Sequence, residues 1–299
     1  MFLKFALPIV GDVEFPAYMT MVMVAFTIAI WLARREEDGL GRNGDRIVDL
    51  GLWMLAFAML GSRLLSVVAD GKFDDFVHLC TDPKLVPAID AKVRVCTEAA
   101  QCGYDYLCNA DTHRCYPPRD CLAALKFWQG GLAFYGGFLF AAPVGIWYAK
   151  RKNLGGWRVA DLTAPMIAFG QSIGRLGCFF NGCCYGKHTD GPFAVSFPDH
   201  PHVHPTQLYE SAGTLAIFCF LYFVVRPRKR AHGQVFAALL VLYGILRFAL
   251  EFLRDDERGL LAGLSTSQWI ALPLVALGCW LWIGRPSGQV RSHPSPPGS

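Results

Sequence analysis

Gly174-Arg-Leu-Gly-Cys-Phe-Phe-Asn-Gly-Cys-Cys-Tyr-Gly186 places an arginine, an asparagine and three cysteines at the end of a long apolar run. An arginine at the centre of a membrane span costs roughly 2.5–3.5 kcal/mol, so it usually has a function or a partner. Glycines in the stretch allow tight turns and a close approach of the backbone to a polar ligand. The stretch therefore predicts a membrane helix that ends in a polar site. The alternative is a helix end whose arginine only reaches for the lipid head groups.

The composition is that of a protein that crosses a membrane several times. Of the 299 residues, 53% are hydrophobic and only 17% are charged, and the mean hydropathy is +0.31, which is more apolar than a soluble core requires. The formal net charge is +4, and no basic cluster interleaved with aromatic residues indicates nucleic acid. We therefore expect membrane lipids, and not nucleic acid, as partners.

Seven apolar runs are long enough to be membrane helices. They are Ala17–Ala33, Leu50–Ala69, Phe127–Ala149, Val159–Phe180, Pro205–Val225, Gly233–Leu253 and Gly259–Gly284. Met1–Pro16 has one lysine and no basic region followed by a cleavage-like site, so we do not expect a cleavable signal peptide. The sequence predicts an all-α integral membrane protein with seven transmembrane helices.

Changes of composition divide this chain into four parts. Residues 1–70 hold the first two spans, and residues 71–126 form a cysteine-rich loop. Residues 127–284 hold spans three to seven with the predicted lipid-binding site. Residues 285–299 are rich in proline, serine and glycine, and we expect a disordered tail there.

Basic residues mark one side of the predicted spans. Clusters of lysine and arginine follow the first, third, fifth and seventh runs, beginning at Arg34, Lys150, Arg226 and Arg285. By the positive-inside rule, that side is cytoplasmic. We therefore expect an outside N-terminus, an inside C-terminus and a cysteine-rich loop on the extracytoplasmic side.

With this topology, the polar residues of the spans fall toward the outer leaflet. They are Arg63, Tyr135, Arg175, Gln207, Tyr209, Glu210, Arg247, Glu251 and Arg254. Scattered structural ion pairs would not be expected to gather on one side. A functional site in the outer leaflet is the better interpretation.

The sixth run carries a polar stripe. Tyr243, Arg247 and Glu251 are spaced i, i+4, i+8, and Arg254 lies one turn beyond. A helix-stabilising pair of Arg247 with Glu251 is the simpler alternative, but it does not explain Arg175 on another span. Several arginines in one pocket, with few acids to neutralise them, suit a phosphate, because the guanidinium fork matches phosphate oxygens. In the outer leaflet, that ligand is a phospholipid head group.

Six of the eleven cysteines lie in or beside the extracytoplasmic loop: Cys80, Cys96, Cys102, Cys108, Cys115 and Cys121. No C-x-x-C pair occurs among them, so disulfides are favoured over a structural zinc site, and the pairing stays open. Such a loop would form a cap over the pocket or a docking module for a partner.

The other cysteines have different settings. Cys178, Cys183 and Cys184 lie in the opening stretch, where a disulfide that pins the turn is favoured over a reactive thiolate beside Arg175. Cys219 and Cys279 stand alone in apolar runs, where we expect small buried hydrophobic residues. A metal site has little support, and we expect no metal and no cofactor.

Six short motifs follow one another along the chain. They are Gly61-Ser-Arg63-Leu, Gly130-Gly-Leu-Ala-Phe-Tyr-Gly-Gly137, the opening stretch, His204-Pro-Thr-Gln-Leu-Tyr-Glu210, Tyr243-Gly-x-x-Arg247-Phe-x-x-Glu251-x-x-Arg254 and Ser267-Gln268. In this order they resemble the signature segments of bacterial prolipoprotein diacylglyceryl transferases. The resemblance covers nearly the whole chain except the cysteine-rich loop and the tail.

The resemblance implies a reaction and a location. It implies transfer of a diacylglyceryl group from phosphatidylglycerol to the lipobox cysteine thiol of a preprolipoprotein signal peptide, with glycerol phosphate as the leaving group. This is the first step of bacterial lipoprotein maturation, and it would occur at the outer leaflet of the inner (plasma) membrane.

The resemblance also implies roles for site residues. Arg175 and Arg247 would hold the phosphate and stabilise the charge of the leaving group. Tyr243 and Glu251 would orient Arg247, and Asn181 would bind the glycerol or its phosphate. Further substrate-binding residues would be Arg63, Gly136, Gly137, Gln207, Glu210 and Arg254.

Three positions depart from the family pattern. Tyr135 replaces a histidine, Cys178 an asparagine and Cys183 a glutamate. A tyrosine with an unperturbed pKa of about 10 is a poor base at neutral pH, so we expect Tyr135 to orient lipid through its hydroxyl. The thiol must still lose its proton to a base before it attacks.

These departures keep other functions open. The chain could be a paralogue with a different acceptor, or a phospholipid-binding or receptor-like protein without turnover. A transporter is disfavoured, because the polar groups lie at one side of the membrane and not at a midplane between inverted repeats.

Overall fold

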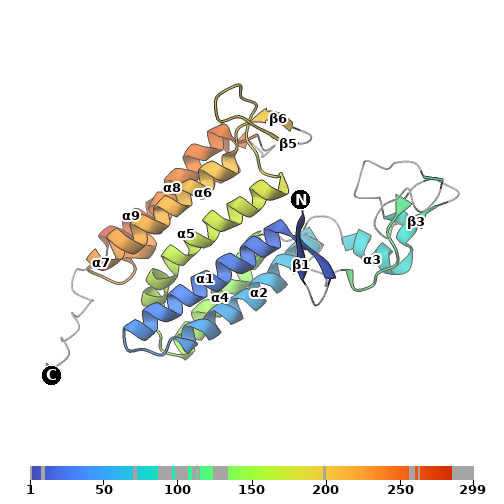
Figure 1. Ribbon diagram of the computed structural model, residues 1–299. Coiled ribbons are helices and arrows are strands. Elements are labelled where there is room, and N and C mark those ends of the chain that lie inside the picture. Colours follow the sequence, from blue (N-terminus) through green and yellow to red (C-terminus); the bar gives the residue numbers. More distant parts are fainter. Residues whose placement is uncertain are drawn as a thin grey trace. The chain divides into compact units, whose positions relative to one another are not determined.

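The computed structural model describes residues 2–7, 11–69, 73–86, 96–97, 107–109, 113, 115–123, 134–197, 200–255, 260–261 and 263–284. The chain divides into two compact units. One comprises residues 1–48 and 149–299, and the other residues 49–148. Figure 1 labels their helices and strands. The predicted tail lies outside the described residues.

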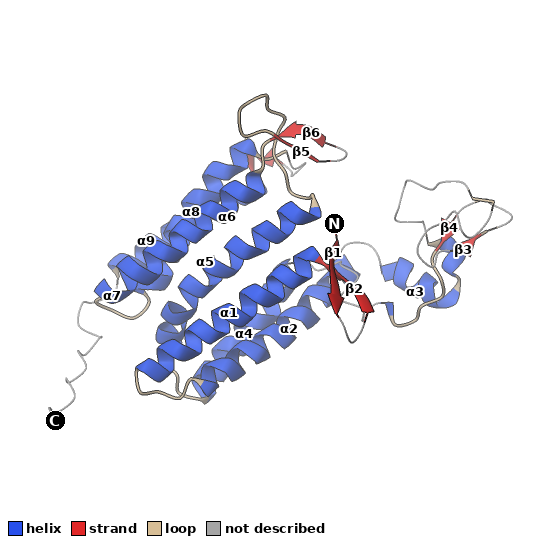
Figure 2. Cartoon of the chain, viewed as in Figure 1, coloured by secondary structure: helices blue, strands red, loops and turns tan. Residues whose placement is uncertain are grey.

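Long helices build the first unit. They are α1 (Ala17–Gly39), α5 (Gly156–Asn181), α6 (Thr206–Cys219), α8 (Gln234–Leu250) and α9 (Thr266–Ile283). α6 continues through a π-helical turn, η5 (Phe220–Val225), into the short α7 (Arg226–Arg228), and α8 ends in a 3-10 turn, η6 (Glu251–Leu253). α1 packs along α5, α5 along α6 and α8 along α9 (Figure 2).

Short antiparallel hairpins join or precede these helices. β1 (Phe2–Leu7) pairs with β2 (Gly11–Pro16), β5 (Val195–Phe197) with β6 (His200–Val203), and β7 (Leu260–Leu261) with β8 (Leu264–Ser265). Phe2 lies opposite Pro16 in the first hairpin.

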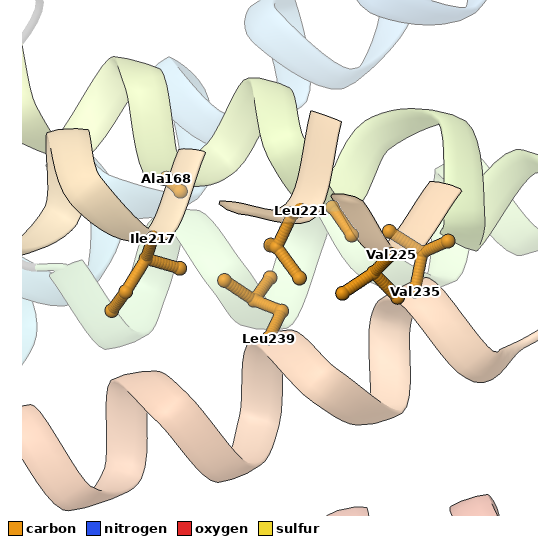
Figure 3. Close-up of a cluster of buried hydrophobic side chains, with 7 residues drawn as sticks. Ala168, Ile217, Leu221, Val225, Val235 and Leu239 are labelled. Atoms are coloured by element: carbon orange, nitrogen blue, oxygen red, sulfur yellow. The ribbon is translucent and has the colours of Figure 1, made fainter. Parts of the chain in front are cut away.

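A cluster of buried aliphatic side chains holds α5, α6 and α8 together (Figure 3). Its members are Ala164, Ala168, Ile217, Leu221, Val225, Val235 and Leu239. Within a membrane, close van der Waals packing replaces the hydrophobic effect as the force between helices. The cluster therefore sets the spacing of three helices that carry polar side chains further along.

A buried carboxylate fixes the beginning of α8. Asp161 of α5 is 1% exposed. One of its oxygens accepts hydrogen bonds from the amides of Val235 and Phe236 at 3.0 and 3.1 Å, and the other accepts from the amide of Gly233 at 2.8 Å and from Lys229 Nζ at 3.2 Å. The N-cap residue of α8, Gly233, has no side-chain cap of its own. Asp161 thus satisfies amides that a helix start would leave unpaired.

We expect Asp161→Ala to destabilise the protein by roughly 1–3 kcal/mol, because it leaves buried amides unsatisfied. The thermal unfolding midpoint in detergent micelles measures the loss. Asp45→Ala is the matched control, since that carboxylate is exposed and forms a surface ion pair with Arg34. Equal midpoints for the two variants would contradict this role of Asp161.

The second unit contains two long helices in close contact, α2 (Asp45–Ala69) and α4 (Phe134–Arg151). A Cβ atom added at Gly61 would lie 2.5 Å from the carbonyl oxygen of Gly136, and one at Gly137 would lie 3.3 Å from that of Ala58. Small residues permit such a close approach of membrane helices. The glycines of the Gly136-Gly137 pair therefore serve helix packing in this unit.

Cystine bridges stabilise the cysteine-rich segment of the second unit. Cys80 is bonded to Cys121 and Cys96 to Cys108, and Cys115 is also disulfide-bonded. The segment includes α3 (Phe73–Thr81), the 3-10 turn η1 (Pro83–Leu85) and a hairpin of β3 (Leu107–Cys108) with β4 (Cys115–Tyr116). Cys102 lies outside the described residues.

By length and composition, four of the described helices could cross a membrane: Asp45–Val68, Thr206–Arg228, Gln234–Leu253 and Thr266–Ile283. The predicted start of the last span, Gly259, is wrong, because the helix begins at Thr266. Ser265 caps it: the Ser265 hydroxyl accepts from the amide of Gln268, and the Gln268 side chain accepts from the amide of Ser265.

Candidate active site

A buried carboxylate, Glu210 of α6, lies among three arginines. Glu210 is 1% exposed. Its Oε1 lies 3.0 Å from Arg175 Nη2 of α5, and its Oε2 lies 3.7 Å from Arg254 Nη1 and 3.9 Å from Arg247 Nη1 of α8. Removal of one partner from a buried ion pair is strongly destabilising, so each charge depends on the others. We call these residues, with Glu251, the arginine cluster.

Arg247 uses one side of its guanidinium for support. Its Nη2 lies 3.0 Å from Glu251 Oε2 and donates a hydrogen bond to Ser267 Oγ at 3.2 Å. Its Nη1 is buried and makes no hydrogen bond to any residue that the structure describes. A buried donor of this kind requires an explanation, and a polar ligand supplies one.

The arginine cluster has a net charge of +1, because three arginines are set against two glutamates (3 − 2 = 1). This corrects the expectation of a pocket with few neutralising acids: Glu210 and Glu251 neutralise most of the charge. The remaining positive charge suits a ligand with a single negative charge, such as a phosphodiester. Burial strengthens that attraction relative to water.

Tyr243 lies in the same group and interacts electrostatically with Arg175 and with Arg247. Its hydroxyl is within hydrogen-bonding reach of the Arg175 guanidinium. The family resemblance implied that Tyr243 and Glu251 orient Arg247. Glu251 contacts Arg247 directly, and Tyr243 lies near both arginines.

The turn after α5 brings the three cysteines of the opening stretch together. Gly182 has a left-handed backbone, with φ of 68°. Its amide donates to Phe179 O at 3.1 Å and that of Cys183 donates to Cys178 O at 3.2 Å, which is a Schellman motif. The motif brings Cys178 and Cys183 to the same side of the turn.

All three cysteines are free, so the predicted disulfide at this turn is wrong. The Schellman hydrogen bonds hold the turn without it. Cys184 Sγ lies 3.7 Å from Cys183 Sγ, and Asn181 Nδ2 lies 3.9 Å from Cys183 Sγ. Hydrogen bonds with the Cys178 and Cys183 thiols hold the pKa of Cys184 well below its usual range, and Arg254 and Arg175 lower that pKa further.

Side chains of the first turn of α6 hold this turn in place. Gln207 Nε2 donates to Cys183 O at 2.6 Å, and Thr206 Oγ1 donates to Cys184 O at 2.9 Å. Gln207 was predicted to bind substrate, and the structure uses its amide nitrogen for the turn. Its buried Oε1 accepts no hydrogen bond from the described part of the chain and stays available to a ligand.

The end of the opening stretch reaches Arg254. Gly186 forms an isolated antiparallel bridge with Arg254, and its amide donates to His204 O at 2.8 Å. A Cβ atom at Gly186 would lie 2.6 Å from Thr206 Cγ2. Only glycine fits this close approach, which connects the opening stretch to the end of α8.

The remaining predicted substrate residues belong to the second unit, and the structure does not place them relative to Glu210. Arg63 Nη2 donates to Ala123 O at 2.7 Å, and its guanidinium lies 5.1 Å from the ring centroid of Phe76. Gly136 and Gly137 take part in the packing of α2 and α4. Tyr135 lies in the first turn of α4, and its side chain is outside the described residues.

Two further findings differ from the sequence expectations. Cys219 and Cys279 are exposed on their helices, not buried, because apolar side chains of a membrane helix face outward as readily as inward. Ser267 and Tyr18 were not predicted as site residues. Ser267 supports Arg247, and Tyr18 packs against Gly177, where an added Cβ would lie 3.2 Å from the Tyr18 ring.

Comparison with known proteins identifies the family. A family model described as prolipoprotein diacylglyceryl transferase matches residues 95–284. A protein of Aromatoleum aromaticum named phosphatidylglycerol–prolipoprotein diacylglyceryl transferase is 32% identical over 284 residues, which are 91% of this chain and 91% of that protein. The chain belongs to the prolipoprotein diacylglyceryl transferase family.

Other relatives extend the match over most of the chain. Proteins of the same name from Nitratidesulfovibrio vulgaris and Clostridium tetani are 31% and 28% identical over 289 and 271 residues. These matches cover 93% and 89% of this chain, and 92% and 91% of the relatives. As a member of the diacylglyceryl transferase family with apolar helices, this chain is a multi-pass membrane protein.

Proposed function

We propose that this protein transfers a diacylglyceryl group from phosphatidylglycerol to a cysteine thiol of prolipoproteins, the first step of lipoprotein maturation. The arginine cluster carries the proposal. Its net charge of +1 complements the single negative charge of a phosphodiester, and the buried Nη1 of Arg247 is a donor without a hydrogen-bond partner among the described residues. The names of the relatives agree with these two substrates.

The arginine cluster promotes cleavage of the bond between the diacylglyceryl group and the phosphate. The thiolate sulfur forms a bond to the terminal glycerol carbon of the diacylglyceryl group, and the bond between that carbon and the phosphate oxygen breaks. The electron pair leaves with glycerol phosphate. Arg175 and Arg247 hold the phosphate and stabilise the charge that develops on its oxygen, an interaction that is strong in a dry site. The products are a thioether and glycerol phosphate.

Buried acids keep the arginines in position for this role. Glu210 holds Arg175, and Glu251 with Ser267 holds one side of Arg247. A guanidinium with fixed orientation loses little freedom when it binds phosphate. Asn181 and the free Oε1 of Gln207 are the proposed partners of the glycerol hydroxyls.

A head-group release assay tests the proposal. The purified protein in mixed micelles of labelled phosphatidylglycerol should release glycerol phosphate only when a peptide with a lipobox cysteine is present. A peptide with serine in place of that cysteine should release none. Lipid binding without release would instead support a phospholipid-binding or receptor-like protein.

We also propose an orientation in the inner (plasma) membrane with the site toward the outer leaflet. It follows from the basic clusters after the first, third, fifth and seventh apolar runs. Reporter fusions within residues 71–126 and within residues 226–232 should respond oppositely, the first as extracytoplasmic and the second as cytoplasmic. The same response from both positions would contradict the orientation.

A further inference from the structure

Cys178, Cys183 and Cys184 form a compact group of thiols that the proposed transfer does not use. Their sulfur atoms all lie within 4.8 Å of one another. The sulfurs of Cys183 and Cys184 are 3.7 Å apart. All three side chains are partly accessible, so an ion could reach them from solvent.

These separations match the requirements of a thiolate metal site. Zinc binds thiolates at about 2.3 Å in a tetrahedron, so neighbouring sulfurs of such a site are about 3.8 Å apart. Cys183 and Cys184 already have this separation. Because all three sulfurs lie within 4.8 Å of one another, no separation exceeds this value by more than about 1 Å, which small side-chain rotations can remove.

The backbone that carries the thiols is fixed. The Schellman motif joins Cys183 to Cys178, and the carbonyl groups of Cys183 and Cys184 accept hydrogen bonds from Gln207 and Thr206 of α6. Cys184 has φ of 65°, a left-handed conformation that is costly for a residue other than glycine. Such strain persists where the surroundings impose it, often at binding sites.

Nearby charges also favour a thiolate site. Arg254 and Arg175 interact electrostatically with Cys184. Asn181 Nδ2 lies near Cys183 Sγ and can donate to the bound sulfur, as neighbours of metal ligands commonly do.

We propose that Cys178, Cys183 and Cys184 bind one Zn²⁺ ion as thiolates and leave its fourth coordination position open. Three protein ligands with an open position are typical of catalytic zinc sites, whereas structural sites use four protein ligands.

The open coordination position could bind the lipobox thiol in the transfer reaction. This part of the inference rests on the proposed function. With an ion bound, the lipobox thiol would occupy the open position in place of hydroxide, and the thiol proton would leave with that hydroxide as water. The three cysteines would hold the ion that keeps the sulfur deprotonated. A thiol that coordinates zinc is deprotonated outright. A bound ion would thus supply the deprotonation of the thiol that the transfer requires. The thiolate then attacks the glycerol carbon as described above.

Cobalt titration tests the metal site without turnover. The full-length protein with its loop disulfides intact, stripped of metal with a chelator under anaerobic conditions, should bind one equivalent of Co²⁺ and develop the sulfur-to-cobalt charge-transfer absorption of thiolate coordination. Cys178→Ser, Cys183→Ser and Cys184→Ser should each weaken binding by at least about tenfold, since each removes one thiolate ligand. Cys219→Ser and Cys279→Ser are controls and should leave binding unchanged. Zn²⁺ should displace the cobalt and abolish the absorption.

Three results would overturn the metal site. One is the absence of the absorption while thiol titration shows Cys178, Cys183 and Cys184 to be free. Another is equal cobalt binding by the triple serine variant. The third is a disulfide among the three cysteines in protein purified without reductant. Circular dichroism of each variant shows whether it is folded.

The role of the open position has its own test. Addition of a lipobox cysteine peptide should shift the cobalt absorption of the wild-type protein, and the serine peptide should not. If cobalt binds and head-group release proceeds but the peptide causes no shift, the thiol-binding step is wrong and the transferase assignment stands. If cobalt binds and the peptide shifts the absorption without any release, the metal site stands and the transferase assignment fails.

Discussion

Replacement of Arg247 by alanine is expected to lower the rate of head-group release by about one hundredfold or more, because it removes an electrostatic donor from a dry site. The donor in question is Nη1, which is buried and makes no hydrogen bond within the described part of the protein. The other terminal nitrogen, Nη2, contacts Glu251 and Ser267, and these contacts fix the orientation of the Arg247 guanidinium group. Head-group release from labelled phosphatidylglycerol is the measurement.

Arg247→Lys separates the loss of charge from the loss of the fork. Lysine keeps the positive charge, so the buried carboxylates still have a cationic partner. This variant should therefore fold and retain a part of the activity. Arg228→Ala is the control, since Arg228 is an exposed arginine whose Nη1 donates a hydrogen bond to Val224 O of the preceding turn. Unchanged turnover in Arg247→Ala with an intact fold would reduce Arg247 to a structural ion pair.

Glu210→Gln is expected to give the largest loss of stability, roughly 3–5 kcal/mol, because it breaks a buried ion pair. Glu210 is 1% exposed and contacts Arg175, Arg247 and Arg254. Without its charge, the net charge of the cluster rises from +1 to +2. The thermal unfolding midpoint in micelles should fall markedly.

Two further variants make the Glu210 result specific. Asp255→Asn neutralises an exposed carboxylate beside Arg254 in the sequence and should leave the unfolding midpoint nearly unchanged. Arg175→Gln in the Glu210→Gln background should restore part of the stability, because it removes one of the arginines left unpaired. If the double variant is less stable by the sum of two independent losses, Arg175 and Glu210 are not coupled.

The helical spacing was sufficient to predict part of the site. Arg247 and Glu251 are four residues apart, and their contact follows from that spacing alone. The position of Glu210 among the three arginines depends on how α5, α6 and α8 pack, which a pattern along one helix does not contain. For the same reason, the sequence showed an excess of positive charge but not the near neutrality of the arginine cluster.

Two features that the structure corrected, the start of α9 and the turn of the three cysteines, had a local sequence pattern that indicated them. In each case another feature of the sequence decided the prediction. Ser265 and Gln268 have the spacing of a capping box, which marks the start of α9, but the apolar run begins several residues earlier. Asn181-Gly182 is a typical helix end, and the Schellman motif there predicts contact of Cys178 with Cys183. The extracytoplasmic setting favoured a disulfide instead. The role of Asp161 at the start of α8 had no such signal, because its partners lie about 70 residues away.

Mass spectrometry of the acceptor peptide tests the central claim most directly. A lipobox peptide incubated with the protein and phosphatidylglycerol should gain the mass of one diacylglyceryl group, attached through a thioether to its cysteine. Arg247→Ala should slow the formation of this product by about one hundredfold or more, given the size of such electrostatic contributions. A peptide that stays unmodified while the wild-type protein binds phosphatidylglycerol would contradict the assignment of this protein as a diacylglyceryl transferase.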